Sequence, residues 1–341
     1  MNFIQHIVEG KDLNIQEAEA LLEEIFSRST DAQIGALLIG LRMKGESVSE
    51  IAGLARTMRA SAIRISPQVD GPLVDTCGTG GDAANTINVS TAAALVTASC
   101  GVPVAKHGNY AVSSDCGSAN VLSELGVNVD LEPDQVKTTI ETLGIGFMLA
   151  PRFHPAMKRV ALLRREIKTR TVFNLLGPLT NPAGANAQVI GVYDPALCEK
   201  LAMVLSILKT ERAMVVHGSG LDEITNTGET LVSELDHGIV RTYTLEPEDF
   251  GYPLVTQDDI KGGSPEDNAR ELVRILKGAQ TPGRDIVAMN SAAALYISGR
   301  VDSLREGTRM AEEALDSGRA LETLENLVKA GGDPDKLRRF L

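Results

Sequence analysis

The residues best suited to bind a phosphate lie in a glycine-rich stretch at 78–82, which reads Gly-Thr-Gly-Gly-Asp. Thr86, Asn88, Ser90 and Thr91 follow it, and the last two open a predicted helix. Glycines let a backbone approach a ligand closely, and a helix N-terminus attracts anions. The stretch is neither a Walker loop nor a GxGxxG sequence, but it suits a pyrophosphate. A glycine turn capped by Ser90, without a ligand, is the alternative for this stretch taken alone.

A second polar cluster, Lys-His-Gly-Asn at 106–109, follows a short apolar run and continues through Ser113, Ser114 and Ser118. Lysine provides a point charge suited to phosphate, and the hydroxyls and glycine supply further donors. We expect His107 to pack or orient this loop rather than to act as an acid or base. The alternative is a polar surface loop.

Two adjacent carboxylates, Asp222 and Glu223, follow the strand-like run 213–216 and a glycine turn. A carboxylate pair in such a place can hold a hard cation such as Mg²⁺. No Cys or His set at zinc spacing accompanies the pair. Acidic pairs are also common on solvated loops, so these two residues alone do not establish a metal site.

A basic segment at 153–165 combines His154 with two arginines on a predicted helix, Arg164 and Arg165. Arginine binds a planar carboxylate through two parallel hydrogen bonds. One of these arginines is therefore a candidate for holding an organic acid, and we expect the other to be a surface charge.

Three helices are predicted in the first 65 or so residues. Asn14, Thr30 and Ser47 are each followed three positions later by Glu or Gln, which is typical of a capping box. The middle helix carries an apolar stripe at i, i+3, i+4 and i+7 and is expected to end near Gly45. These features predict a small helical unit.

After residue 70, strand-like runs alternate with helical ones. That alternation predicts a mostly parallel sheet with helices on both faces, and such sheets bind ligands at the carboxyl ends of their strands. A hairpin is predicted at 230–243, and amphipathic helices at 284–298 and 303–329. The remaining expected strands are 73–75, 102–105, 127–129, 146–149, 187–193 and 213–216, and the expected helices between them are 90–100, 118–125, 133–143 and 195–209.

Composition limits the possible partners. The chain has 341 residues and a formal net charge of −12. Such a protein repels nucleic acid and anionic membranes, whereas a local loop can still bind a small phosphorylated ligand. The four cysteines show no CxxC or paired spacing, so we expect reduced thiols in a cytoplasmic protein. Neither a signal-peptide pattern nor an apolar run of about 20 residues is found, so we expect no membrane span.

The order of these motifs resembles the anthranilate phosphoribosyltransferases. The resemblance begins at 35–53 and runs to about residue 300. The motifs that carry it are GTGGD (78–82), NVST (88–91), KHGN (106–109), GSAN (117–120), FHPAM (153–157), NLLGPLTNP (174–182) and HGSGLDE (217–223).

The resemblance implies an α/β fold with a small helical domain, residues 1–65 with a helical contribution from about 151–170, and a large domain, residues 70–341. It implies transfer of the 5-phosphoribosyl group from phosphoribosyl pyrophosphate (PRPP) to the amine of anthranilate, a step of tryptophan biosynthesis, in a cytoplasmic homodimer. Neither nucleic acid nor membrane is an expected partner.

The resemblance also assigns residues to ligands. Mg²⁺, with two ions expected per site, would be held by Ser90, Asp222 and Glu223. Anthranilate would meet Gly78, Asn109 and Arg164, with His154 and Met157 lining its path. The residues assigned to PRPP are Gly78, Gly81, Asp82, Thr86, Asn88, Val89, Ser90, Thr91, Lys106, His107, Gly108, Asn109, Ser113, Ser114 and Ser118.

Two positions depart from the pattern that the family usually shows. This chain has Tyr110 in place of an arginine and Asn120 in place of an aspartate. Both changes remove a charge, of opposite sign, so our hypothesis is that the two side chains interact and changed together. The amine of anthranilate is neutral, so the reaction requires no strong general base, and neither His107 nor His154 is nominated as one.

Three other functions are weighed against this one. A pyrimidine nucleoside phosphorylase has a similar fold but carries a Lys-x-Ser-Gly-Arg type stretch where this chain has Lys-His-Gly-Asn at 106–109. A nucleic-acid-binding paralogue conflicts with the net charge of −12. A non-catalytic ligand-binding protein of the same fold is the third, and the intact metal, phosphate and acceptor positions argue against it.

Overall fold

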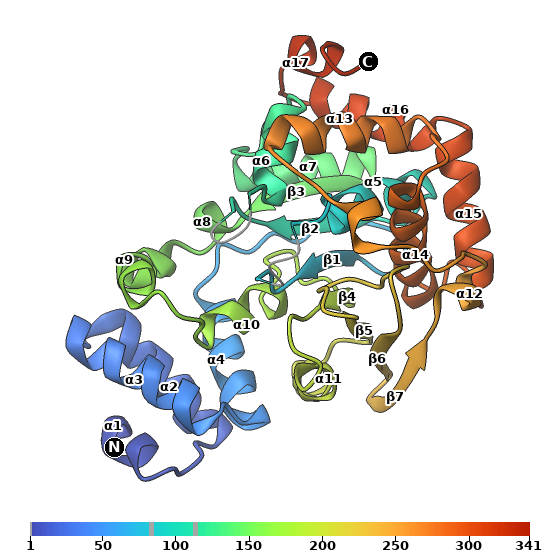
Figure 1. Ribbon diagram of the computed structural model, residues 1–341. Helices are drawn as coiled ribbons and strands as arrows, with labels where there is room; N and C mark the ends of the chain where they lie inside the picture. Colours follow the sequence, from blue (N-terminus) through green and yellow to red (C-terminus); the bar gives the residue numbers. More distant parts are fainter. Residues whose placement is uncertain (1, 82–84, 112–114) are drawn as a thin grey trace.

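The computed structural model describes residues 2–81, 85–111 and 115–341. A group of helices from the N-terminus lies to one side of a larger part built on a central sheet, with α9 next to α3 and α10 next to α4 (Figure 1). None of the described helices is both long and apolar enough to cross a membrane.

The N-terminal helices begin where their capping sequences predict. Asn14, Thr30 and Ser47 each form a capping box, in which the side chain accepts a backbone hydrogen bond and the third helical residue returns one. The middle helix ends at Gly45, as expected. A short first helix was not predicted, because six residues carry little periodicity. These helices are α1 (Phe3–Val8), α2 (Ile15–Ser27), α3 (Asp31–Lys44) and α4 (Val48–Ala60).

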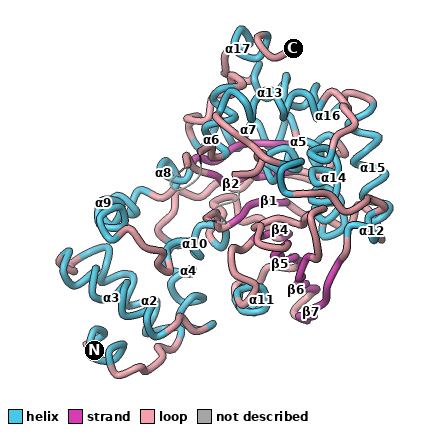
Figure 2. The backbone as a smooth tube through the Cα atoms, in the orientation of Figure 1, coloured by secondary structure: helices cyan, strands magenta, loops and turns pink. Residues whose placement is uncertain are grey.

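The sheet has seven strands in the order β3-β2-β1-β4-β5-β6-β7 (Figure 2). The first five are parallel, and β6 and β7 form the predicted antiparallel hairpin. The direction in which successive strands are added reverses between β1 and β4, which is where such sheets bind their ligands. The strands are β1 (Val74–Gly78), β2 (Val104–Gly108), β3 (Ile145–Leu149), β4 (Ala187–Gly191), β5 (Arg212–Gly218), β6 (Thr230–Asp236) and β7 (Ile239–Leu245).

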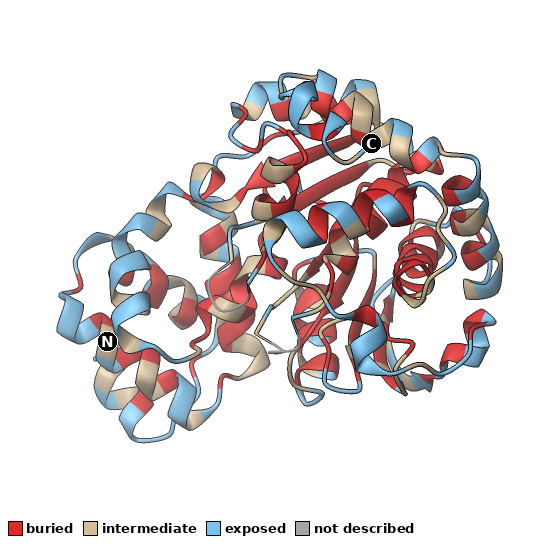
Figure 3. Cartoon of the chain, turned by 45° about the horizontal axis from the view of Figure 1, so that its top comes forward, coloured by how far each residue is buried: buried red, intermediate tan, exposed pale blue. Residues whose placement is uncertain are grey.

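Side chains alternate between two cores along the buried strands. Val189 and Met214 lie in one core with α5 and α14, whereas Ile190 and Val215 lie in the other with α11 and the N-terminal helices. This period of two places buried residues on both faces of the sheet (Figure 3). The helices that complete the fold are α5 (Val89–Ser99), α6 (Ser118–Glu124), α7 (Pro133–Leu143), α8 (Ala150–Phe153), α9 (Lys158–Ile167), α10 (Phe173–Leu179), α11 (Leu197–Ile207), α12 (Pro247–Phe250), α13 (Pro265–Leu276), α14 (Pro282–Ile297), α15 (Leu304–Asp316), α16 (Arg319–Lys329) and α17 (Pro334–Arg338), with 3-10 turns η1 (Pro155–Met157) and η2 (Gln257–Ile260).

Strands β1, β2 and β5 extend beyond their predicted ends, and the elements predicted at 127–129 and 303–329 were wrong. Strand β2 continues through Gly108, so Lys106 and His107 are buried strand residues rather than loop residues. Residues 127–129 form no strand, although both valines are buried, because they belong to a turn after α6. The segment predicted as one helix at 303–329 forms two helices, α15 and α16. Gly318 lies between them with a φ of 78°, a left-handed value that interrupts the helical backbone.

Candidate active site

Four of the five parallel strands end on glycine at one edge of the sheet, at Gly78, Gly108, Gly191 and Gly218. The stretch that starts at Gly78 therefore lies on the same edge as the residues that follow Gly218, although about 140 residues separate them in sequence. This edge brings together the glycine loop, the start of α5 and the carboxylate pair.

Asp222 lies against the strand ends. A Cβ atom on Gly191 would be 1.5 Å from the Asp222 carbonyl oxygen, and one on Gly78 would be 2.3 Å from Asp222 Oδ2. The backbone N–H of Gly80 donates to Asp222 Oδ2 at 2.7 Å. Only glycine at 78 and 191 leaves room for this approach, which fixes the carboxylate beside the glycine loop.

A tight turn after β5 delivers Asp222 to this position. Gly218 and Leu221 exchange two backbone hydrogen bonds of 3.0 and 2.9 Å, and Ser219 and Gly220 have positive φ angles of 47° and 95°. On the far side, the carboxamide of Asn290 on α14 accepts from the N–H of Ile224 and donates to its carbonyl. The loop is thus anchored at both ends.

Glu223 and Lys106 meet at Ser90, the second residue of α5. The N–H of Ser90 donates to Glu223 Oε1 at 3.2 Å, and Lys106 Nζ donates to Ser90 Oγ at 3.3 Å and to the Thr76 carbonyl at 2.7 Å. Burial lowers the pKa of Lys106, and the charge of Asp75 opposes that shift. The charge of Asp75 favours the protonated form of Lys106. The lysine therefore presents a positive charge next to the N-terminus of α5, and both features suit an anionic ligand.

The oxygen donors at this point fit a hard cation. Asp222 and Glu223 supply carboxylates and Ser90 supplies a hydroxyl, which are the donor types that Mg²⁺ prefers. No group of three or more His, Cys, Asp or Glu side chains that could hold a metal occurs among the described residues, so a zinc-type site is not found there.

A buried polar network supports Lys106 from below. Asp75 is fully buried on β1, and its carboxylate accepts from the N–H of His107 at 3.2 Å and from Asn181 Nδ2 at 2.8 Å. Burial raises the pKa of Asp75, whereas the charge of Lys106 and these hydrogen bonds lower it. Asn181 Nδ2 also donates to the Ala105 carbonyl at 2.8 Å, so the network joins β1 and β2 directly beneath the site.

His107 and His154 are buried side by side, with ring centroids 5.1 Å apart. Burial lowers the pKa of His107 to about 3 and that of His154 to about 4, and for His107 the neighbouring His154 adds to the shift. Both rings are therefore neutral at physiological pH, and their low pKa values make them weak bases.

Arg164 and Arg165 differ in their surroundings. Arg164 is half-buried on α9, and its guanidinium lies 5.5 Å from the centroid of the Phe173 ring, whereas Arg165 is exposed. Burial lowers the pKa of Arg164, which nevertheless keeps its charge because arginine cannot be deprotonated in proteins. No hydrogen bond links Arg164 to Asn109 in the described part of the chain. Met157 is partly buried and packs against the core that contains Val160 of α9.

Arg170 contacts the glycine loop and was missed at the sequence level. Its guanidinium donates to the Gly81 carbonyl and lies 3.9 Å from the centroid of the Tyr193 ring. Gly81 has a φ of 80°, and a Cβ there would be 2.9 Å from Arg170 Nη2. Arg170 stands at the end of the helical segment expected at about 151–170 and belongs to none of the motifs, so only the fold reveals the contact.

The residues assigned to PRPP near α5 lie just before this helix or in its first turn. Thr86 forms an isolated antiparallel bridge with Lys261, and Val89 and Thr91 are buried in the first turn of α5. The Thr91 hydroxyl has no hydrogen-bond partner among the described residues. Asp82, Ser113 and Ser114, which were also predicted, lie outside the described residues.

The loop after β2 closes on the start of α6. Gly108 is tightly packed, since a Cβ there would be 2.3 Å from Ser118 Oγ, and Ser118 Oγ donates to the Asn109 carbonyl at 3.3 Å. Asn120 Oδ1 accepts the backbone N–H groups of Ala111 at 2.9 Å and residue 117 at 3.1 Å.

The expected pairing of Tyr110 with Asn120 was wrong for the described structure. The Asn120 carboxamide binds the backbone instead, and the Tyr110 side chain is exposed. An aspartate at 120 could accept the same two hydrogen bonds. In this structure Asn120 contacts the backbone next to Tyr110 and not the Tyr110 side chain.

Two family models match the chain over most of its length. One, described as the helical bundle domain of a glycosyl transferase family, matches residues 1–62, and the other, described as the a/b domain of that family, matches residues 70–321. The fold and these matches define a glycosyl transferase.

Comparison with individual relatives identifies the enzyme family within this class. Anthranilate phosphoribosyltransferase from Methanosarcina acetivorans is 57% identical over 319 residues, covering 94% of this chain and 86% of that protein. The structure of the Thermus thermophilus enzyme of that name has a TM-score of 0.92 at 43% identity, covering 97% of this chain and 99% of that one. The Saccharomyces cerevisiae enzyme in complex with PRPP and Mg has a TM-score of 0.88 at 28% identity, covering 96% of each chain. The chain belongs to the anthranilate phosphoribosyltransferase family.

The two buried histidines predict how stability depends on pH. Their folded pKa values, about 3 and about 4, lie below the ordinary value of 6.5, so the unfolded chain binds more protons between those limits. The free energy of unfolding should be unaffected by these groups above pH 6.5 and fall as the pH drops toward 4, by up to about 1.4 kcal/mol per pH unit for each histidine.

Urea unfolding of the wild type and of His107→Asn/His154→Asn between pH 4 and pH 7.5 measures this. The double variant should show a flatter dependence than the wild type, and the slope rather than the absolute stability is the readout. His237→Asn, at an exposed hairpin residue, is the matched control. Equal slopes for the wild type and the double variant would mean that the rings do not titrate as their burial requires.

Proposed function

We propose that this chain transfers the 5-phosphoribosyl group of PRPP to the amine of anthranilate, giving N-(5-phosphoribosyl)anthranilate and pyrophosphate. Membership of the family supports the reaction. The observation that supports its location is the contact of Asp222 with Gly80, which joins a carboxylate pair to a glycine loop at the strand edge. Hydrogen-bond donors to phosphate and oxygen ligands for a cation would then face the same small volume.

PRPP would be bound by the glycine loop, the start of α5 and the polar residues that end β2. Gly78 and Gly81 bring backbone groups close to the ligand, and Lys106 supplies a positive charge below Ser90. Asn88 to Thr91 present the N-terminal turn of α5, which favours anions. Loop residues 109 and 118 would close the other side of the ligand.

Mg²⁺ would be held by Ser90, Asp222 and Glu223, with two ions per site as the finer proposal. When bound, the cation neutralises charge that develops on the departing pyrophosphate. The chain's own contribution is to fix the carboxylates: Gly80 holds Asp222, and the N–H of Ser90 holds Glu223.

Anthranilate would be held so that its nitrogen faces C1 of the ribose. Arg164 would bind the carboxylate, with Gly78, Asn109, His154 and Met157 around the ring. Orientation of this kind lowers the barrier without a change in the chemistry. The amine attacks as C1 loses pyrophosphate, and its proton leaves late, to water or to pyrophosphate. The neutral rings of His107 and His154 fit a positioning role rather than proton transfer.

We also propose the assembly and location that the family implies. Residues 1–65, with the helical segment at about 151–170, would form the small domain, and residues 70–341 the large one. Val8 on α1 and Met43 on α3 are 73% and 83% exposed, and such apolar side chains on the helical domain support a homodimer formed there. The protein would be cytoplasmic.

Loss of anthranilate fluorescence in the presence of PRPP and Mg²⁺ tests the reaction. The signal should require both, and EDTA should abolish it. Asp222→Asn/Glu223→Gln keeps the side-chain shapes but removes both negative charges, and it should lower kcat/KM roughly a hundredfold or more. Asp258→Asn, at an exposed residue of η2, is the charge control and should behave as the wild type.

Activity that survives EDTA and the double substitution would contradict the proposed metal site. PRPP binding seen by calorimetry, without consumption of anthranilate, would contradict the acceptor and would turn the search to pyrimidine bases.

The two adjacent arginines give a matched test of the acceptor site. Arg164→Lys keeps the charge but loses the two-pronged contact with a carboxylate, so KM for anthranilate should rise about tenfold or more while PRPP affinity stays unchanged. Arg165→Lys at the exposed neighbour should change either value less than twofold. Steady-state kinetics with each substrate varied measures both. Equal effects of the two substitutions would remove Arg164 from the acceptor site.

A further inference from the structure

A segment from the C-terminal half of the chain, residues 260–268, lies along residues 85–88, which precede α5. The N–H of Ile87 donates to the Ile260 carbonyl at 3.2 Å, and the N–H of Gly262 donates to the Asn85 carbonyl at 2.7 Å. Thr86 and Lys261 face each other between these bonds as an antiparallel bridge. The two segments thus form a short two-stranded contact outside the main sheet.

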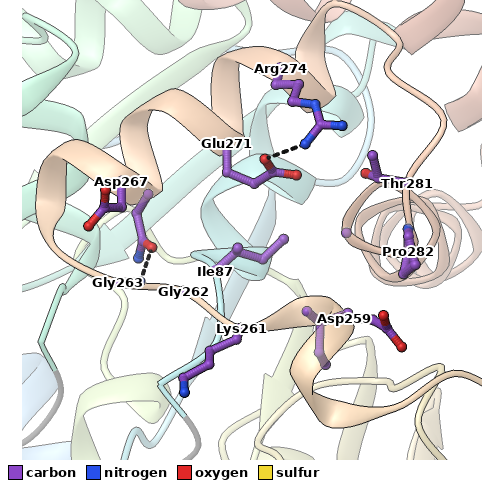
Figure 4. Close-up of a pocket in the computed structure, with 13 residues that line it drawn as sticks. Ile87, Asp259, Lys261, Gly262, Gly263, Asp267, Glu271, Arg274, Thr281 and Pro282 are labelled. Carbon is purple, nitrogen blue, oxygen red and sulfur yellow. Dashed lines mark hydrogen bonds and ion pairs between the residues drawn. The ribbon is translucent and has the colours of Figure 1, made fainter.

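This contact leaves little room for adjustment. A Cβ atom on Gly262 would be 2.5 Å from the Thr86 carbonyl oxygen and 2.7 Å from Asn268 Oδ1. Beside it lies a cavity of about 420 Å³ that has Ile87 on its wall, and Figure 4 shows Ile87 between Glu271 and Lys261. Ile87 is nevertheless buried in the core shared with α5 and α14, so apolar packing and the backbone hydrogen bonds together hold residues 85–88.

The Asn88 side chain is bonded on both its oxygen and its nitrogen within the protein. Its Oδ1 accepts from Asn268 Nδ2 at 2.9 Å, and its Nδ2 donates to the Cys116 carbonyl at 3.1 Å. The Cys116 thiol also lies 3.4 Å from Asn88 Oδ1. The carboxamide of Asn88 therefore joins the start of α5 to Cys116, just before α6, and these bonds fix the backbone at the start of α5.

Asn268 links this junction to the 260–268 segment. It is 2% exposed on α13, its Oδ1 accepts from the N–H of Gly263 at 2.8 Å, and its Nδ2 makes the bond to Asn88. Only a group that accepts on one side and donates on the other satisfies both neighbours. An acidic side chain of similar size cannot donate to Asn88, and an apolar one can bond neither neighbour.

We propose that Asn268 is a positioning residue for PRPP. It acts through Asn88, holding the turn at 85–88 and the first turn of α5 in the arrangement that receives the pyrophosphate and ribose phosphate groups. This inference rests on the proposed PRPP site and extends it to a side chain 150 or more residues from the residues assigned to PRPP.

Asn268→Asp tests the role with almost no change of shape. One carboxylate oxygen still accepts from the N–H of Gly263, but the other oxygen faces Asn88 Oδ1, so two acceptors meet without a proton between them. Flipping the Asn88 carboxamide would instead turn its oxygen toward the Cys116 carbonyl, which is also an acceptor. We expect KM and Kd for PRPP, measured by kinetics and calorimetry, to rise about tenfold. KM for anthranilate should stay the same and kcat should change less than threefold. Asn326→Asp on α16, the same change of charge elsewhere, should leave all values unchanged.

Asn268→Ser, which removes both bonds without adding charge, provides a second route and should also weaken PRPP selectively. A purely structural role would lower the urea midpoint while PRPP and anthranilate constants stay as in the wild type, and that result would overturn the proposal. Equal PRPP affinity of wild type and folded variants would overturn it too. A wild type that binds no PRPP would overturn the proposed function, and this inference with it.

Discussion

The structure depends on the close approach of one loop to the ends of two strands. The carbonyl oxygen of Asp222 occupies the space that a Cβ on Gly191 would need, and its carboxylate does the same at Gly78. Because β1 and β4 are neighbours on either side of the reversal in strand order, the loop after β5 can cross both ends. Residues from positions near 80, 90 and 220 thereby share one volume, and the turn at Gly218–Leu221 together with Asn290 on α14 keeps the loop in place.

That constraint explains how an acidic protein can bind a polyanion. The net charge is −12, yet the strand edge concentrates backbone N–H groups, a helix N-terminus and the buried Lys106. Asp75 compensates the lysine from below, and its contacts with His107 and Asn181 tie β1 to β2, so the charge is held in one position. The carboxylates of Asp222 and Glu223 would repel phosphate by themselves, which is why the proposed site places a cation between them and the ligand.

Much of this arrangement is predictable from sequence, and the exceptions have physical reasons. Capping boxes located the starts of α2, α3 and α4 because they are local signals. The extent of β2 was underestimated, because Lys106 and His107 look like loop residues until Asp75 and His154 are known to lie beside them. The contributions of Arg170 and Asn268 were missed entirely. Each acts on a residue more than 80 positions away, through a contact that only the folded chain creates.

The most direct measurement is the binding of PRPP with Mg²⁺ to Gly191→Ala, by calorimetry, alongside urea unfolding. A methyl group at 191 meets the backbone of Asp222 rather than a flexible side chain, so the loop must move away from the strand ends. The account predicts that binding weakens at least tenfold in a protein that still folds, whereas Gly35→Ala, where a Cβ meets nothing within 4 Å, binds as the wild type does. Wild-type affinity in Gly191→Ala would contradict the claim that this close approach assembles the site.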